Sequence, residues 1–225
     1  MELSQRDYDV LRLINTFTQL SSVHLGELVF SDRSHSVPDR ILGRLTRLNY
    51  LNRVGRRVSG DNGGAGAFTY QLGRHGRTLF EVEGRLSPIV NNHALMIADT
   101  YLALKRAEKA GFLTLTRWEV ELLVPPVVRA DLFVVLDFLS PRRGSSYFLE
   151  IDLGTEAAVR IRDKIAGYWR AVQSSGADFP YVVFVVKRPE RVREIERVIR
   201  KLPDEQQEMV RVFLLAELIP QLMEL

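Results

Sequence analysis

The sequence predicts a mixed α/β protein in two parts, with three helices and a β-hairpin first and an α-β-β-β-α-β-α-β series after them. Two observations lead to this prediction. In the first ninety residues, apolar side chains recur at helical spacing and then give way to two strand-like runs around a glycine-rich tip. From residue 91 on, a long helical pattern precedes three strand-like runs, and helical patterns separate the later strands.

The first part is expected to open with three helices within about fifty residues. Helix one follows the candidate cap Ser4, and a shorter second helix opens after Ser21 or Ser22. The third helix, expected over 37–51, tolerates Pro38 because this residue lies in the first turn.

Two sets of side chains are expected on different sides of the third helix. The apolar set, which should pack, is Ile41, Leu45 and Leu48. The basic set, which should face outward, is Arg40, Arg44 and Arg47.

Residues 50–59 and 68–73 are expected to be two strands joined by the flexible tip "GDNGGAGA", and a closing helix follows over 74–83. Three helices and a β-hairpin in this order predict a winged helix-turn-helix, with domain bounds 1–86. In such a domain the third helix enters the major groove and the wing contacts the DNA backbone or the minor groove. The expected DNA contacts are Ser34, His35, Ser36, Asp39, Arg40, Arg44, Arg47, Arg53, Arg56 and Arg57. The alternative is that these arginines form an ordinary solvated surface.

The charge distribution favours the DNA-binding alternative. The whole chain has a net charge of only +3, but residues 33–77 contain nine Arg and two acidic residues. Such a local excess of positive charge attracts phosphate backbones, so double-stranded DNA is the expected partner.

The composition also excludes several classes of protein. The absence of Cys excludes disulfides, thiolate catalysis and Cys-type zinc sites. The N-terminus lacks the pattern of a secretory signal, and no apolar run reaches the length of a membrane span. A cytoplasmic protein without a membrane partner is therefore expected.

The second part, residues 91–225, should begin with a long helix that packs through Leu95, Ala98, Leu102 and Leu104. The other elements are predicted in order: strands over 112–123, 128–138 and 147–153, a helix over 155–174, a strand over 181–187, a helix from Pro189 and a strand over 210–218. The loop of the second hairpin should span 140–146. The apolar end of the chain, 212–225, either forms a homodimer interface or completes the core.

Three carboxylates are expected to converge on the sheet of this second part. Asp131 lies on one strand, and Glu150 and Asp152 share a face of the neighbouring strand because they are two residues apart. Converging carboxylates repel unless a cation or protons compensate them, and Mg²⁺ or Mn²⁺ prefers such oxygen ligands. The alternative is structural: Asp131 begins an edge strand, Glu150 pairs with an Arg, and Asp152 caps the helix that starts near Thr155.

The "RAD" that opens one strand and the "EID" on the next resemble the PD-(D/E)xK nuclease fold. The resemblance implies that Asp131 and Glu150 bind metal and that a Lys assists the attacking water, but Asp152 occupies the usual Lys position. Some members of that superfamily place the Lys on the following helix, where Lys164 is the candidate. The implied catalytic set is Asp131, Glu150, Asp152 and Lys164, with the first three as metal ligands.

The chain as a whole resembles the replication-relaxation family of plasmids and other bacterial mobile elements. This resemblance depends on the winged helix, a helix that opens with His93, the "RAD" strand and the segment "FLEIDLGTEAAVRIRDKIAGYW". The matching positions are Glu150, Asp152, Gly154, Thr155, Glu156, Lys164 and Tyr168. His93 and Tyr168 are expected to contact the metal ligands and not the metal.

Together these observations predict a DNA-binding protein of a plasmid or mobile element, which recognises duplex DNA through its winged helix. The predicted role is replication and relaxation, transfer, or their regulation, including regulation of transcription, with replication or mobilisation proteins as partners. The missing Lys predicts a degraded nuclease-like domain. The alternatives are an active Mg²⁺- or Mn²⁺-dependent endonuclease or nickase, and a scaffold that binds only proteins.

Overall fold

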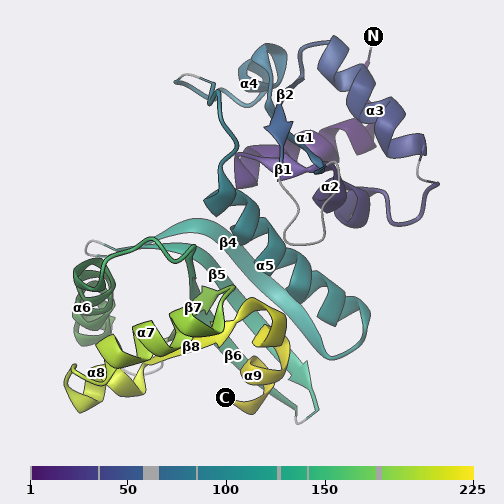
Figure 1. Ribbon diagram of the computed structural model, residues 1–225. Coiled ribbons are helices and arrows are strands. Elements are labelled where there is room, and N and C mark those ends of the chain that lie inside the picture. The colour runs from purple at the N-terminus through teal and green to yellow at the C-terminus, as the bar shows by residue number, and fades with distance from the viewer. Residues whose placement is uncertain are drawn as a thin grey trace. The chain divides into compact units, whose positions relative to one another are not determined.

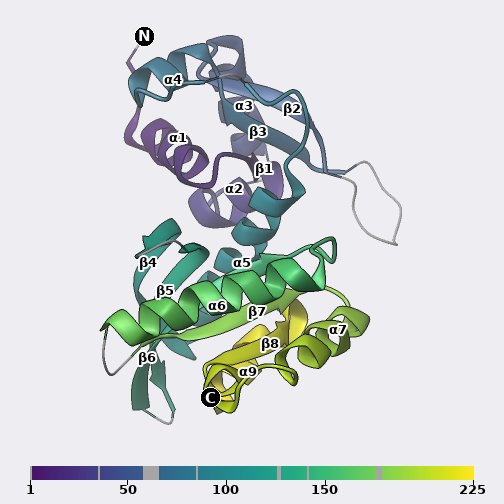
Figure 2. The same cartoon turned by 90° about the vertical axis from the view of Figure 1, so that its left-hand side faces the viewer.

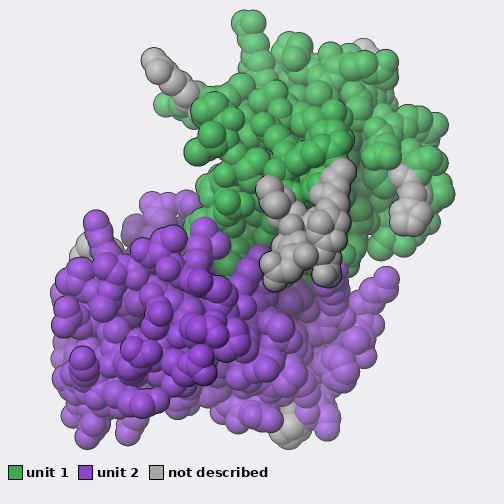
Figure 3. All heavy atoms as spheres, in the orientation of Figure 1, with its two compact units in different colours: residues 1–102 green, residues 103–225 purple. Residues whose placement is uncertain are grey.

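The computed structural model describes residues 2–34, 36–57, 66–84, 86–125, 128–140, 142–175 and 179–225. The chain forms two compact units, residues 1–102 and 103–225, which are coloured separately in Figure 3. Helices and two sheets occur together, so the predicted mixed α/β class is confirmed. Among the described residues, no helix combines the length and the apolar character needed to cross a membrane.

The first unit contains helices around a small antiparallel sheet with strand order β1-β3-β2 (Figure 1). Its elements are α1 (Gln5–Phe17), β1 (Leu20–Ser21), α2 (Ser22–Val29), α3 (Ser36–Arg47), β2 (Leu51–Arg56), β3 (Phe68–Leu72), α4 (Arg74–Leu79) and the beginning of α5 (Asn92–Lys109). Three helices therefore precede the β2–β3 hairpin, in the predicted order.

Side-chain caps fix the starts of α1 and α2. Ser4 and Asp7 form a capping box, in which the Asp7 N–H donates to Ser4 Oγ at 3.3 Å and the Ser4 N–H donates to Asp7 Oδ2 at 2.9 Å. Ser21 and His24 cap α2 in the same way. The predictions that the first helix follows Ser4 and that the second opens after Ser21 or Ser22 are both confirmed.

The packing side of α3 differs from the predicted one. Leu45 is buried as expected, but its buried companion is Leu42, whereas Ile41 and Leu48 remain partly exposed. Helical spacing alone gives a broad apolar side. The neighbouring elements decide which residues of it are covered.

The second unit contains a five-stranded mixed sheet with strand order β4-β5-β6-β7-β8 (Figure 2). Its elements are β4 (Leu113–Val124), β5 (Val128–Leu139), β6 (Arg142–Asp152), α6 (Ala158–Ser175), β7 (Tyr181–Val186), α7 (Pro189–Ile199), α8 (Asp204–Glu208), β8 (Val210–Leu214), the 3₁₀ turn η1 (Leu215–Glu217) and α9 (Leu218–Glu224). Strands β4, β5 and β6 are antiparallel neighbours, and β7 and β8 run parallel to β6. The antiparallel meander followed by helix-linked strands is therefore present as predicted.

Helices α6 and α7 cover one face of this sheet (Figure 2). Their apolar side chains share a core with strand residues, and the rings of Phe148 on β6 and Tyr168 on α6 stack with centroids 5.3 Å apart. This face contains the even-numbered residues of β6, among them Glu150 and Asp152.

Several boundaries differ from the predicted ones. Strand β6 begins at Arg142, within the predicted loop 140–146, because Arg142 already pairs with Leu139 in a tight hairpin. Its first residues have only β5 as a neighbour, since β7 pairs with β6 only from Tyr147 onward. They do not need the apolar alternation that marks a covered strand. Helix α6 begins at Ala158 and not near Thr155.

The last strand ends at Leu214 and not at the predicted residue 218, and the end of the chain forms helix α9. Leu218 and Leu222 of α9 have no exposed surface, and the Leu222 carbonyl accepts hydrogen bonds from Arg143 and Tyr147. Of the two uses left open for residues 212–225, completion of the core is the one that α9 fulfils.

Candidate functional site

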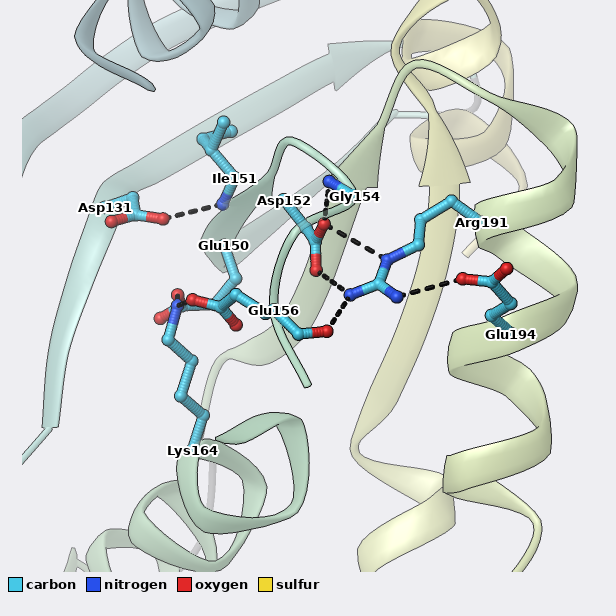
Figure 4. Close-up of polar contacts among 9 residues, drawn as sticks. All are labelled: Asp131, Glu150, Ile151, Asp152, Gly154, Glu156, Lys164, Arg191 and Glu194. Atoms are coloured by element: carbon cyan, nitrogen blue, oxygen red, sulfur yellow. Dashed lines mark hydrogen bonds and ion pairs between the residues drawn. The ribbon is translucent and has the colours of Figure 1, made fainter. Parts of the chain in front are cut away.

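The candidate site lies at the end of β6, the central strand of the five-stranded sheet, where this strand separates from β5 (Figure 4). The β5–β6 ladder ends at the pair Leu132 and Leu149. Beyond it, the Ile151 N–H donates to Asp131 Oδ2 at 2.7 Å, so a carboxylate replaces the backbone carbonyl that a ladder would supply. This bond holds Asp131 beside Glu150.

Glu150 has no exposed surface and accepts hydrogen bonds at both of its carboxylate oxygens. Lys164 Nζ donates to Oε2 at 2.8 Å, and the Tyr168 hydroxyl donates to Oε1. Both donors come from α6 and are four residues apart, so they lie on one face of this helix and bind the same carboxylate.

The surroundings of Glu150 shift its proton equilibrium. Burial and the negative charge of Asp131 raise the pKa of Glu150 to about 7, although Lys164 and Tyr168 act in the opposite direction. Burial, together with the charge of Glu150, also raises the pKa of Tyr168, so this hydroxyl stays a donor.

Lys164 lies among acidic groups. Its Nζ is 2.8 Å from Glu150 Oε2 and 3.1 Å from Glu156 Oε1. Burial opposes the charge, but attraction to Glu150 and, further away, to Asp131 and Glu156 outweighs burial and raises the pKa of Lys164. A permanent ammonium therefore compensates this acidic cluster. The cluster is here defined as Asp131, Glu150 and Glu156.

Asp152 binds a different cation. Arg191 of α7 donates to both of its oxygens, from Nε to Oδ1 at 3.2 Å and from Nη2 to Oδ2 at 2.6 Å. The Gly154 N–H also donates to Oδ1. Arg191 further reaches the Glu156 carbonyl at 2.7 Å and Glu194 Oε2 at 3.0 Å. Hydrogen bonding to Asp152 is the main reason that the pKa of Arg191 is raised.

The structure thus separates the three carboxylates that were expected to converge. Asp131 and Glu150 lie together with Lys164, whereas Asp152 joins β6 to α7 (Figure 4). The structural alternative also needs correction, because the cation beside Glu150 is a Lys and not an Arg. Asp152 was expected in that alternative to cap the helix near Thr155. It accepts a hydrogen bond from the Gly154 N–H instead, and α6 begins only at Ala158.

The contacts of this cluster leave few carboxylate oxygens for a divalent metal. Both oxygens of Glu150 are used as acceptors, one oxygen of Asp131 is bound to the Ile151 N–H, and Lys164 already supplies the compensating charge. Among the described residues, no group of three or more His, Asp or Glu side chains could hold a metal ion.

The residues predicted to contact DNA fall into two groups. Exposed at the surface are Ser34, Ser36, Asp39, Arg40, Arg47, Arg53 and Arg56, while His35 lies outside the described residues. Arg44 and Arg57 are partly buried and each binds an acid within the first unit.

The two partly buried arginines have structural contacts. Arg44 forms an ion pair with Asp7, which has no exposed surface, and so joins α3 to α1. Arg57, at the end of β2, donates to both oxygens of Asp99 on α5 at 2.7 and 2.6 Å. Asp99 Oδ1 is also 2.9 Å from His24 Nε2.

Arg53 and Arg56 stack on one aromatic ring of the hairpin. Each guanidinium carbon lies 3.8 Å from the centroid of Phe68, and both side chains remain exposed. Arg56 also donates from Nη1 to the Gly66 carbonyl at 2.8 Å, and the other N–H donors of a guanidinium that stacks by its face stay available to an anion.

His93 and Tyr168, which were expected to contact the metal ligands, lie in different places. Tyr168 is buried against Glu150. His93 is the second residue of α5 in the first unit, where its N–H donates to Asn91 Oδ1 at 3.1 Å.

Sequence reasoning missed four partners: Asp7, Asp99, Arg191 and Glu194. Two of them had a local signal: Asp7 follows Ser4 at the spacing of a capping box, and Glu194 follows Arg191 at the i,i+3 spacing of a helical ion pair. Asp99 and Arg191 contact residues that are distant in the sequence, and no spacing pattern marks such contacts.

Two compact units, of which the second buries an ion-paired acidic cluster at the end of its central strand, define this chain as a two-part mixed α/β protein. The chain belongs to the replication-relaxation family, whose model matches residues 11–186, and the resemblance seen in the sequence is thereby confirmed. Comparisons with curated proteins and with solved structures gave no match.

Proposed function

We propose that this protein binds duplex DNA of a plasmid or other mobile element through its first unit and acts in replication and relaxation, transfer, or their regulation. The main support is a set of exposed cations on α3 and β2: Arg40, Arg47, Arg53 and Arg56. Within the described residues, none of these four side chains forms an ion pair with a carboxylate. The family description, replication-relaxation, supports the replication context.

The order of elements supports a winged helix-turn-helix as the DNA-binding module. Helix α3 follows helices α1 and α2, and the β2–β3 hairpin follows α3. In a winged helix-turn-helix the third helix enters the major groove and the hairpin contacts the flanking backbone. We therefore assign base and phosphate contacts to the exposed residues of α3 and its preceding turn, and phosphate contacts to Arg53 and Arg56.

Arg44 and Arg57 are left out of this proposed contact surface. Each is held by a carboxylate of the same unit, Asp7 and Asp99 respectively. Their role in the proposal is to fix α3 and the base of the hairpin in place.

The double variant Arg40→Ala/Arg47→Ala tests the proposal by fluorescence anisotropy with labelled duplex DNA over a range of salt concentrations. We expect at least about tenfold weaker binding and a smaller salt dependence, since each lost phosphate contact lowers the slope by about one. The matched control is Arg193→Ala/Arg200→Ala, which removes two exposed, ion-paired charges from α7 and the residue that directly follows it. Equal affinity and equal slope for both double variants would exclude α3 as the DNA-binding element.

The second unit is proposed to be nuclease-like without being a nuclease. Its order of elements resembles that expected for the PD-(D/E)xK fold and supports this proposal, but the acidic cluster is compensated by Lys164 and Asp152 is bound to Arg191. The second candidate function is an active Mg²⁺- or Mn²⁺-dependent endonuclease or nickase. It is favoured by the proximity of Asp131, Glu150 and Lys164, the residues that such chemistry would use.

A further inference from the structure

A hollow of about 510 Å³ lies at the surface of the second unit, between α6 and α7. Four basic side chains line it: Arg162 from α6, Arg191 and Arg197 from α7, and Lys201 just after α7. Among the described residues that line it, Glu194 is the one acidic side chain, and the apolar contribution includes Ile161 and Val198.

Glu194 does not neutralise Arg162, Arg197 or Lys201. Glu194 binds Arg191 at 3.0 Å, and Arg191 also binds Asp152 (Figure 4). Arg162, Arg197 and Lys201 are exposed, and no acidic partner for them occurs in the described ranges. Three uncompensated positive charges therefore face one hollow.

Two basic residues close to the hollow, in contrast, do have acidic partners. Arg193 pairs with Glu190 at 3.5 Å, and Arg200 pairs with Glu196 at 3.1 Å. Both pairs lie outside the lining of the hollow. Of the described basic residues on α7 and directly after it, Arg197 and Lys201 line the hollow without an acidic partner, although like charges held close together destabilise a fold unless a counter-charge compensates them.

We propose that this hollow binds phosphate groups. Two guanidinium groups and an ammonium match a phosphate better than a carboxylate-rich ligand, because guanidinium donors pair with phosphate oxygens in a bidentate manner. A volume of about 510 Å³ lies in the range of pockets that hold small ligands. The phosphate belongs either to the backbone of a nucleic acid strand or to a free nucleotide or pyrophosphate. The site is separate from the arginines of α3 and β2, and it does not depend on DNA binding by the first unit.

The test compares two double variants of the full chain. Arg197→Ala/Lys201→Ala removes two cations from the hollow, and Arg193→Ala/Arg200→Ala removes two paired cations from the same surface of α7 with the same change in net charge. Circular dichroism and thermal unfolding establish that both variants fold. A third variant, Arg162→Ala, removes the basic side chain that α6 contributes to the hollow.

The first arm of the test measures pyrophosphate binding by isothermal titration calorimetry. We expect the wild type and the Arg193/Arg200 variant to bind pyrophosphate with similar affinity. The Arg197/Lys201 variant should bind at least about tenfold more weakly, because charge-assisted hydrogen bonds are lost.

The second arm measures binding of labelled single-stranded and duplex oligonucleotides against salt concentration. If the phosphate belongs to a nucleic acid, the salt slope of the Arg197/Lys201 variant falls by about two relative to the control. An effect on pyrophosphate alone identifies a free phosphate ligand. The proposal is overturned if the Arg197/Lys201 variant equals the control in both arms. Failure of DNA binding by the first unit is recognised separately, since Arg40→Ala/Arg47→Ala changes the oligonucleotide arm only.

Discussion

The protonation of Glu150 is decided by its neighbours. The side chain has no exposed surface, and the carboxylate of Asp131 lies beside it. Burial favours the neutral acid, whereas Lys164 favours the charged form. Because burial and Asp131 prevail, the pKa of Glu150 rises to about 7, and the group changes charge within the physiological range.

This shift predicts how the free energy of unfolding depends on pH. The unfolded chain releases the Glu150 proton near pH 4.5, but the folded protein releases it near pH 7. The folded state thus holds more protons between these values. The contribution of Glu150 to stability is fully present below about pH 4.5 and is lost as the pH rises to about 7.

We expect the free energy of unfolding of the wild type to fall by about 3 kcal/mol over this pH interval, relative to Glu150→Gln, which cannot titrate. Urea unfolding at a series of pH values measures the difference. The comparison concerns the pH slopes and not the absolute stabilities of the two proteins. Parallel slopes for the two proteins would show that Glu150 titrates normally.

At the scale of elements, Asp152 and Arg191 connect β6 to α7. The two side chains share two hydrogen bonds and are almost completely buried, with 2% and 9% of their side-chain surface exposed. A buried ion pair contributes little compared with an apolar pair of the same shape, but loss of one partner leaves an uncompensated charge.

A double-mutant cycle on this pair has a definite expectation. Arg191→Ala should lower the free energy of unfolding by about 3–5 kcal/mol, because it leaves the Asp152 carboxylate buried without a cation. Asp152→Ala should cost less, because Arg191 keeps its ion pair with Glu194. The double variant should lose clearly less than the sum of the two single losses. The exposed pair of Glu190 and Arg193 provides the control, with changes within about 0.5 kcal/mol. Strict additivity at Asp152 and Arg191 would contradict the proposed connection.

The same elements show how far the sequence predicts the site. Parity along β6 correctly places Glu150 and Asp152 on one face of the sheet. That face, however, is covered by two helices, and each carboxylate meets a different one: Glu150 contacts Lys164 of α6, and Asp152 contacts Arg191 of α7. Spacing along a strand contains no information about which helix lies above which residue. The helices and strands could be predicted because their apolar periodicity is local, but this separation could not.

At the scale of the whole molecule, the sequence predicts where the positive charge lies more reliably than how it is used. Residues 33–77 hold the basic excess, yet Arg44 and Arg57 stabilise the first unit internally. In the second unit, basic and acidic residues are nearly equal in number, 19 and 18, but Arg162, Arg197 and Lys201 gather at one hollow whose acidic side chain, Glu194, is bound to Arg191. Pairing in three dimensions, and not the count of charges, decides which cations remain available to an anion.

The balance of charge at the acidic cluster also predicts whether the molecule cleaves DNA. Hydrolysis through a divalent ion requires carboxylate oxygens that are free to bind it, but both oxygens of Glu150 accept hydrogen bonds from α6. We expect that supercoiled plasmid incubated with the protein and Mn²⁺ remains supercoiled, as judged by agarose electrophoresis. Glu150→Ala should behave like the wild type in this assay. Nicking by the wild type that disappears in Glu150→Ala would instead establish the endonuclease alternative. It would require Lys164 and Tyr168 to release Glu150 when DNA binds, since their hydrogen bonds occupy both oxygens that the reaction would need.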